Sequence, residues 1–160
     1  MHPSKNSLPE AVRFQICQML STHLAEAVDL QHQYTHAHWN VKGPHFIGLH
    51  KLFEELADQL DPVIDDIAER IVQLGGTPNG TVQGVTAATR LPEMPVNLFE
   101  GLALVQQTSL AAAAFAARVR EGVDLTGESG DALTADLLTE AGRLLDKQVW
   151  LLDAHLQASR

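Results

Sequence analysis

The sequence has few cysteines, few positively charged residues and no long apolar run, and each of these features is typical of a common class of protein. Cys17 is its one cysteine, which excludes an intrachain disulfide framework and fits a reducing compartment. Eleven lysines and arginines stand against twenty acids, and a net charge of −9 disfavours general binding to nucleic-acid phosphates. The longest uninterrupted apolar run, Leu110 to Ala117, is too short to span a bilayer, and the N-terminal MHPSKNSLPE lacks the apolar core of a secretory signal. We therefore expect a cytoplasmic protein without a membrane segment.

Aromatic residues are also scarce, at 5% of the chain, and β-branched residues are few beside alanine and leucine. This composition favours helix over sheet. A chain of 160 residues is expected to form a single domain, 1–160, with residues 1–6 as a short tail. Cys17 lies in an apolar helical pattern, which favours a buried, unreactive thiol over a nucleophile.

Apolar residues recur every three or four positions in four long stretches, which predicts an all-α four-helix bundle. The first helix is expected to begin at a capping box, Ser7 to Glu10, and to run to about Asn40. The second ends at Gly75-Gly76 and contains Pro62, which should bend it.

The connection between the second and third helices is long. Residues 75 to 96 are rich in turn-forming residues, with a short helix predicted at Thr81 to Ala88. At about 3.3 Å per residue this segment can cross the whole bundle, so the second and third helices can run parallel, as in ferritin-like bundles. A second capping signal, Asn97 to Glu100, starts the third helix, which is expected to stop near Gly122. The segment GVDLTGESGD is then a loop before a fourth helix spanning Leu133 to Leu156.

Five side chains that commonly bind metals lie close together in the sequence: His38, His50, Glu54, Asp65 and Glu69. On one helix the last four fall within an arc of roughly 100°, but His50 and Glu69 are roughly 28 Å apart along the axis, so no single ion can touch both in one chain. The four positions are symmetric about residues 59 and 60. A second, antiparallel copy would bring His50 opposite Glu69 of its partner, and Glu54 opposite Asp65, which predicts two identical sites per two-fold dimer. His38 can join because the chain reverses at Gly43-Pro44.

Imidazole and carboxylate ligands together suit Fe(II) and, less selectively, Zn(II) or Mn(II). The alternative is a solvated, charged helix face, and the symmetry and the two histidines favour the metal site. Ferritin-like di-iron proteins place Glu-x-x-His pairs inside one bundle, and this chain has no such pair, which favours the site between subunits. His32 and His36, four residues apart, could hold additional zinc, or could be surface or hydrogen-bonded histidines.

The pattern H-x11-H-x3-E-x10-D-x3-E, set in AHWNVKGPHFIGLH and followed by IAERIVQLGG, resembles the Dps family, the DNA-binding proteins from starved cells or miniferritins. TADLLTEAGRLLDKQVWLL resembles that family's last helix, so the resemblance covers nearly the whole chain. It implies a ferroxidase centre in which one subunit supplies His38, His50 and Glu54, and its two-fold mate supplies Asp65 and Glu69. It also implies a dodecameric shell that stores iron after oxidation by hydrogen peroxide, preferably, or dioxygen, and so limits oxidative damage.

The resemblance suggests further roles. Trp39, beside His38, could trap a radical by being oxidised sacrificially, with packing as the alternative for it and for Trp150. Direct DNA binding is the alternative function, although the tails offer only Lys5 and Arg160 as cations. Acids are expected to line pores that admit iron or to nucleate mineral: Glu121, Asp124, Glu128, Asp131 and Asp136 for the pores, Asp58 and Asp61 for the mineral.

Overall fold

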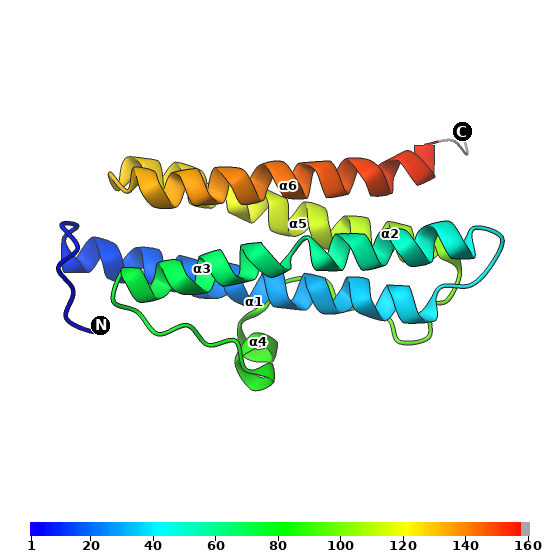
Figure 1. Ribbon diagram of the computed structural model, residues 1–160, viewed down its shortest axis with the longest axis horizontal. Helices are drawn as coiled ribbons and strands as arrows, with labels where there is room; N and C mark the ends of the chain where they lie inside the picture. Colours follow the sequence, from blue (N-terminus) through cyan, green and yellow to red (C-terminus); the bar gives the residue numbers. More distant parts are fainter. Residues whose placement is uncertain (158–160) are drawn as a thin grey trace.

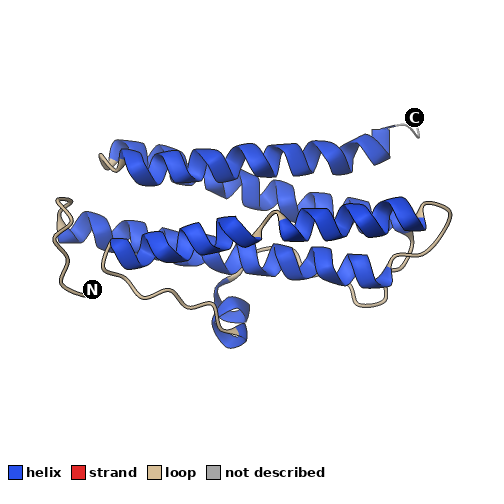
Figure 2. Cartoon of the chain, viewed as in Figure 1, coloured by secondary structure: helices blue, strands red, loops and turns tan. Residues whose placement is uncertain are grey.

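The computed structural model describes residues 1–157 as six helices: α1 (Glu10–Asn40), α2 (Phe46–Asp58), α3 (Asp61–Gln73), α4 (Val82–Ala88), α5 (Gly101–Glu128) and α6 (Ala132–Gln157). Helices α2 and α3 follow one another end to end and together serve as one long helix of a four-helix bundle, with α1, α5 and α6 as the others (Figure 1). The short helix α4 lies outside the bundle against α1. This part of the chain contains no strand, which confirms the predicted all-α class (Figure 2).

The crossover between α3 and α5 carries the chain from one end of the bundle to the other. As a result α2, α3 and α5 all run in the same direction (Figure 1). The crossover is held to α1 by two hydrogen bonds, from Thr89 Oγ1 to Asp29 Oδ2 (2.6 Å) and from Gln33 Nε2 to the Pro92 carbonyl (3.0 Å). The long connection, its short helix and the parallel second and third helices are as predicted.

The second predicted helix is broken where Pro62 requires it. Proline has no N–H to donate to the carbonyl four residues earlier. The chain tightens instead, with the Leu60 amide donating to the Ala57 carbonyl (3.0 Å), and α3 then begins with the Ile64 amide donating to the Leu60 carbonyl (2.9 Å). The predicted bend is therefore confirmed, and it falls at residues 59 and 60, midway between the predicted ligands.

A glycine pair ends α3, as predicted. Gly75 has a φ of +89°, and the Gly75 and Gly76 amides donate to the carbonyls of Val72 (2.9 Å) and Ile71 (2.8 Å), which is a Schellman cap. The N-terminal tail lies against this turn, with the His2 amide donating to the Gly75 carbonyl (2.7 Å).

The predicted capping box at the start of α1 is wrong. Pro9 is the N-cap and no side chain caps the helix. Because Pro9 has an extended ψ of 142°, the helix begins two residues later than the box requires, and Glu10 stands in its first position rather than its third. At the start of α5, Glu100 is the N-cap, and its carboxylate accepts hydrogen bonds from the Leu102 and Ala103 amides.

The predicted end of the third helix is also wrong. Helix α5 continues past Gly122 to Glu128 and turns at Gly130, whose φ is +77°. Gly122 is buried against α1, where a Cβ atom would lie 2.9 Å from His23 Nε2 and 2.9 Å from Met19 Sδ. This glycine allows two helices to approach closely and does not stop α5.

The core is built from fully buried side chains on every long helix. Tyr34 on α1 donates through its hydroxyl to Gln148 Oε1 on α6 (3.2 Å), and Gln148 Nε2 donates to the Leu56 carbonyl on α2 (3.1 Å). Cys17 is buried, as predicted, and burial raises the pKa of its thiol. Among the described helices α5 alone is long and apolar enough to cross a membrane, and half of its most apolar stretch is buried inside the bundle, as in a core helix.

Candidate metal centre

The turn between α1 and α2 brings two of the predicted ligands into contact. The imidazole rings of His38, near the end of α1, and His50, on α2, stack with centroids 3.8 Å apart and planes inclined by 21°. Each ring points its Nδ1 at the backbone of the other residue, with 2.8 Å from His38 Nδ1 to the His50 carbonyl oxygen and 2.9 Å from His50 Nδ1 to the His38 carbonyl oxygen. Gly43, whose φ is +111°, allows the turn.

These hydrogen bonds fix which nitrogen of each ring carries the proton when the ring is neutral. A carbonyl oxygen only accepts, so each Nδ1 must carry the proton and donate it. The lone pair of each neutral imidazole is then on Nε2. Histidines that bind metals generally donate their other N–H to a carbonyl or carboxylate in this way. His38 and His50 are therefore prepared to bind a metal through Nε2.

The other three predicted ligands do not complete a site with the two histidines in a single chain. Glu54 is one helical turn beyond His50 on α2, whereas Asp65 and Glu69 lie on α3 beyond the break, and all three are exposed. Within residues 1–157, no three His, Cys, Asp or Glu side chains of one chain converge closely enough to hold a metal ion. A complete site would need a second chain, and the ligand set remains a prediction.

Two further predictions concern tryptophans and a histidine pair. Trp39 is 73% exposed and Trp150 is 61% exposed, so neither indole packs in the core of the chain. His32 is exposed, and the closest polar contact of the His36 ring is between its Nδ1 and Asn40 Nδ2 (3.5 Å). Within residues 1–157 no carboxylate completes a metal-binding group with these two histidines, and the zinc pair remains a prediction.

One of the acids assigned to pores cannot have that role. Asp131 is 3% exposed, and its carboxylate accepts hydrogen bonds from Arg70 Nη2 and from Thr134. The other four acids of that group are exposed, as are the two acids expected to nucleate mineral.

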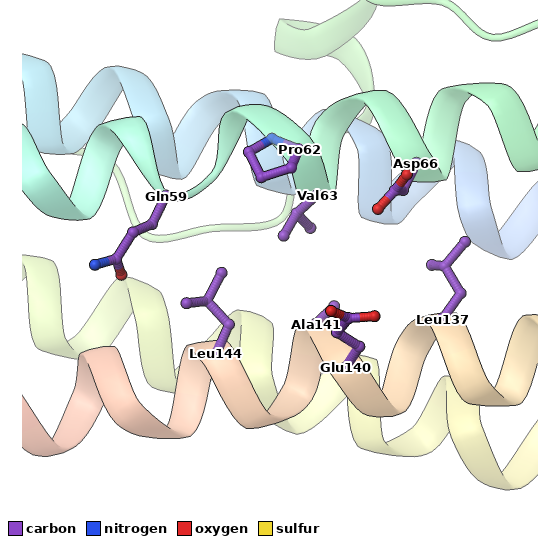
Figure 3. A pocket seen from close by; sticks show the side chains of 8 residues that line it. All are labelled: Gln59, Pro62, Val63, Asp66, Leu137, Glu140, Ala141 and Leu144. Carbon is purple, nitrogen blue, oxygen red and sulfur yellow. The ribbon is translucent and has the colours of Figure 1, made fainter.

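A cavity of about 310 Å³ opens beside the break between α2 and α3, facing α6 (Figure 3). Asp66 and Glu140 border it, and Pro62, Val63 and Leu144 are among its apolar walls. None of the five predicted ligands lines it, so this cavity is separate from the candidate metal centre.

Sequence patterns did not indicate one buried polar group. Glu26 on α1 is fully buried and lies 2.6 Å from Arg118 on α5, with His23 one turn earlier on α1. The signal that could have found it is a carboxylate within the apolar face of the first helix, between Leu24 and Leu30.

Comparisons with known proteins agree on one family. The ferritin-like domain matches residues 17–160. The DNA protection during starvation protein of Agrobacterium fabrum is 39% identical over 156 residues, which cover 98% of this chain and 96% of that protein.

Solved structures give the same result. A Dps protein from Vibrio cholerae O1, described as a member of a broad superfamily of ferritin-like diiron-carboxylate proteins, matches with a TM-score of 0.91 and 28% identity over 98% of both chains. DpsC from Streptomyces coelicolor matches with a TM-score of 0.91 and 30% identity, over 98% of this chain and 90% of that one. Sequence and fold therefore show that this chain belongs to the ferritin-like family and, within it, to the Dps proteins.

Proposed function

We propose that this protein is a ferroxidase that oxidises Fe(II) at sites shared by two chains and stores the ferric product inside a hollow shell. The reciprocal hydrogen bonds of His38 and His50 carry this proposal. They use the Nδ1 atom of each ring and leave both Nε2 atoms available to bind a metal near one end of α2. Glu54 stands one turn further along the same helix. These three ligands form half of a site.

The other half comes from the partner chain. Asp65 and Glu69, one turn apart on α3, are exposed and engaged in no ion pair among the described residues. An antiparallel pairing of two chains about residues 59 and 60 brings them opposite His50 and Glu54. Carboxylates favour the ferric product, because a hard ion of higher charge gains most from anionic oxygen ligands.

The reaction with hydrogen peroxide needs water as its only other reactant. Two Fe(II) ions each give up one electron, the O–O bond of peroxide breaks, and with two waters the products are two FeOOH units and four protons. Dioxygen is the alternative oxidant. The removal of Fe(II) and peroxide together protects DNA and other cell components. We also propose that Trp39, which is exposed and adjacent to His38 in the sequence, intercepts a radical by being oxidised.

We propose that the oxidation and storage of iron take place in a closed, hollow shell of protein chains. We infer a dodecamer in the cytoplasm, with Fe(II) drawn in by exposed acids around the end of α5 and the start of α6: Glu121, Asp124, Glu128 and Asp136. Iron is the expected metal, and zinc would compete for the same imidazoles.

A complementation experiment tests the shared site. One variant carries His50→Ala and Glu54→Ala, and the other carries Asp65→Ala and Glu69→Ala. Each alone should lose ferroxidase activity, followed as ferric absorbance after Fe(II) and peroxide are added. In a mixed dimer one of the two sites regains all five ligands, so an equal random mixture should recover about a quarter of the wild-type rate. If mixing restores nothing while each variant still assembles, the sites are not shared.

Direct DNA binding is the competing function, and the relative from Agrobacterium fabrum is named for DNA protection. The chain carries a net charge of −9, and Lys5 is the one lysine or arginine of the N-terminal tail. Arg160 lies outside the described residues. We expect no gel shift of duplex DNA at low salt, and a shift that moderate salt abolishes would instead indicate phosphate binding.

A further inference from the structure

A buried charged group crosses the bundle between α1 and α5. Glu26 on α1 is fully buried, and its Oε1 lies 2.6 Å from Arg118 Nε on α5. His23, one turn before Glu26, is 3% exposed, and its Nδ1 lies 3.8 Å from Glu26 Oε2. The His23 ring meets the Phe115 ring edge-on, with centroids 6.0 Å apart.

Arg118 neutralises the charge of Glu26 but does not satisfy the hydrogen-bonding atoms of Glu26 and His23. A buried carboxylate requires a cation beside it, because desolvation of an unpaired charge is very unfavourable. The guanidinium supplies that charge at 2.6 Å, but its N–H groups are not aligned for a hydrogen bond, so Arg118 Nε and Nη2, both carboxylate oxygens of Glu26 and both ring nitrogens of His23 lack a hydrogen-bond partner. Unsatisfied buried polar atoms are uncommon and call for a physical explanation.

The unpartnered atoms of His23 and Glu26 are of the kinds that bind divalent metals. Imidazole nitrogen and carboxylate oxygen bind divalent transition metals at about 2.0–2.2 Å, and a separation of 3.8 Å between His23 Nδ1 and Glu26 Oε2 allows one ion to touch both. Ferritin-like di-iron proteins hold their metals at the centre of the bundle with such side chains. Here a guanidinium lies beside the carboxylate of such a pair.

Arg118 enters this position from the surface. Its side chain is 23% exposed and lines a cavity of about 400 Å³, which is also bordered by His23, Arg90 and Glu121. A neutral side chain at residue 118 would therefore leave Glu26 and His23 without their cation, beside an opening to solvent.

We propose that Arg118 takes the place of a divalent cation inside the bundle. Its charge occupies a two-ligand site made by His23 and Glu26 and excludes Fe(II) from it, so that substrate iron is confined to the site between chains. This proposal goes beyond the ferroxidase function and can be tested without any oxidation reaction.

The test measures how much Co(II) each chain binds, by equilibrium dialysis and visible absorbance. Every protein carries His50→Ala and Asp65→Ala, which remove two of the five predicted interface ligands and give all variants the same background. In this background Arg118→Met should bind one additional Co(II) per chain, and adding Glu26→Gln should abolish the gain. Arg118→Lys keeps the positive charge and should show no gain. Arg120→Met, which breaks the exposed ion pair with Asp146 two residues along the same helix, is the matched control.

Circular dichroism must show each variant to be folded. If Arg118→Met does not fold, Arg118→Gln replaces it, because its amide can donate a hydrogen bond to Glu26 while removing the charge. Folded Arg118→Met or Arg118→Gln without extra Co(II), or extra Co(II) that persists with Glu26→Gln or appears equally with Arg118→Lys, would overturn the proposal.

Discussion

Arg70 and Asp131 form a buried ion pair that joins α3 to the start of α6. Arg70 Nη2 donates to both carboxylate oxygens, at 2.8 and 3.1 Å, and Arg70 Nε donates to Thr134 Oγ1 at 2.8 Å. The same carboxylate accepts the Thr134 amide (3.1 Å) in the first turn of α6. Arg70 directly follows Glu69, so this ion pair also anchors the part of α3 that carries a predicted ligand.

The first prediction concerns stability in acid. Burial raises the pKa of Asp131, but the hydrogen bonds from Thr134 and the nearby Arg70 guanidinium lower it by a larger amount. The pKa of Asp131 therefore lies below the ordinary value of 3.8. The native state therefore binds this proton more weakly than the unfolded state. The stabilisation is complete above pH 3.8 and is lost as the pH falls through the native pKa. Urea unfolding between pH 7 and pH 2 should show this loss, and Asp131→Asn should reduce it.

The size of the effect at neutral pH provides a second measure of the same ion pair. Asp131→Ala leaves Arg70 buried and unpaired, and should lower the free energy of unfolding by about 3–5 kcal/mol. The pair of Arg120 and Asp146 has side chains 64% and 56% exposed, so Asp146→Ala should change stability by about 1 kcal/mol or less. Equal losses in the two variants would contradict this account.

The next prediction uses the one tyrosine of the chain. Tyr34 is fully buried, and burial raises its pKa well above the ordinary value of 10. The hydroxyl should stay protonated in the native state, so stability is lost as the pH rises above 10, where the unfolded chain ionises. Tyrosinate absorbance in an alkaline titration should appear only together with loss of helical circular dichroism. Absorbance that rises before unfolding would show an accessible hydroxyl.

Tyr34→Phe should remove that absorbance and also weaken the fold. Gln148 Oε1 would lose its donor inside the core, and an unsatisfied buried acceptor costs about 1–3 kcal/mol. Urea unfolding at pH 7 measures this loss.

A pair of glycines on α5 tests the close approach of α1. In Gly122→Ala the new methyl group would meet His23, Met19 and Leu138 at 2.9–3.0 Å, and overpacking of this kind costs about 1–3 kcal/mol. Gly127→Ala is the control, because nothing lies within 4 Å of its added Cβ, and alanine's better helix propensity should stabilise by up to about 1 kcal/mol. Thermal unfolding compares the two, and a stabilising Gly122→Ala would refute the packing role.

Much of the fold could be predicted because it depends on local signals. The hydrophobic period and the positions of glycine and proline predicted the end of α1 at Asn40, the helix at Thr81 to Ala88 and a bend at Pro62, where the structure has a break between α2 and α3. The end of α5 could not be predicted in this way, because Gly122 does not end the helix. Its missing side chain makes room for α1. A sequence pattern does not separate a glycine that ends a helix from one that lets another helix approach.

The candidate site was predictable to the extent that its parts are close in sequence. The chain reversal at Gly43-Pro44 was enough to expect His38 beside His50, and the two rings do stack. The role of Asp131 was misjudged because its partner, Arg70, is 61 residues away. Glu26 was passed over for the same reason, since its burial depends on Arg118.

The break at residues 59 and 60 has a consequence for the proposed dimer. Each chain gives ligands from α2 to one site and ligands from α3 to the other, on opposite sides of one bend. A change in the bend angle moves both sets and alters both sites together. Occupation of the first site therefore favours the angle that the second site requires, and Fe(II) uptake by the pair should be cooperative, with a Hill coefficient above one.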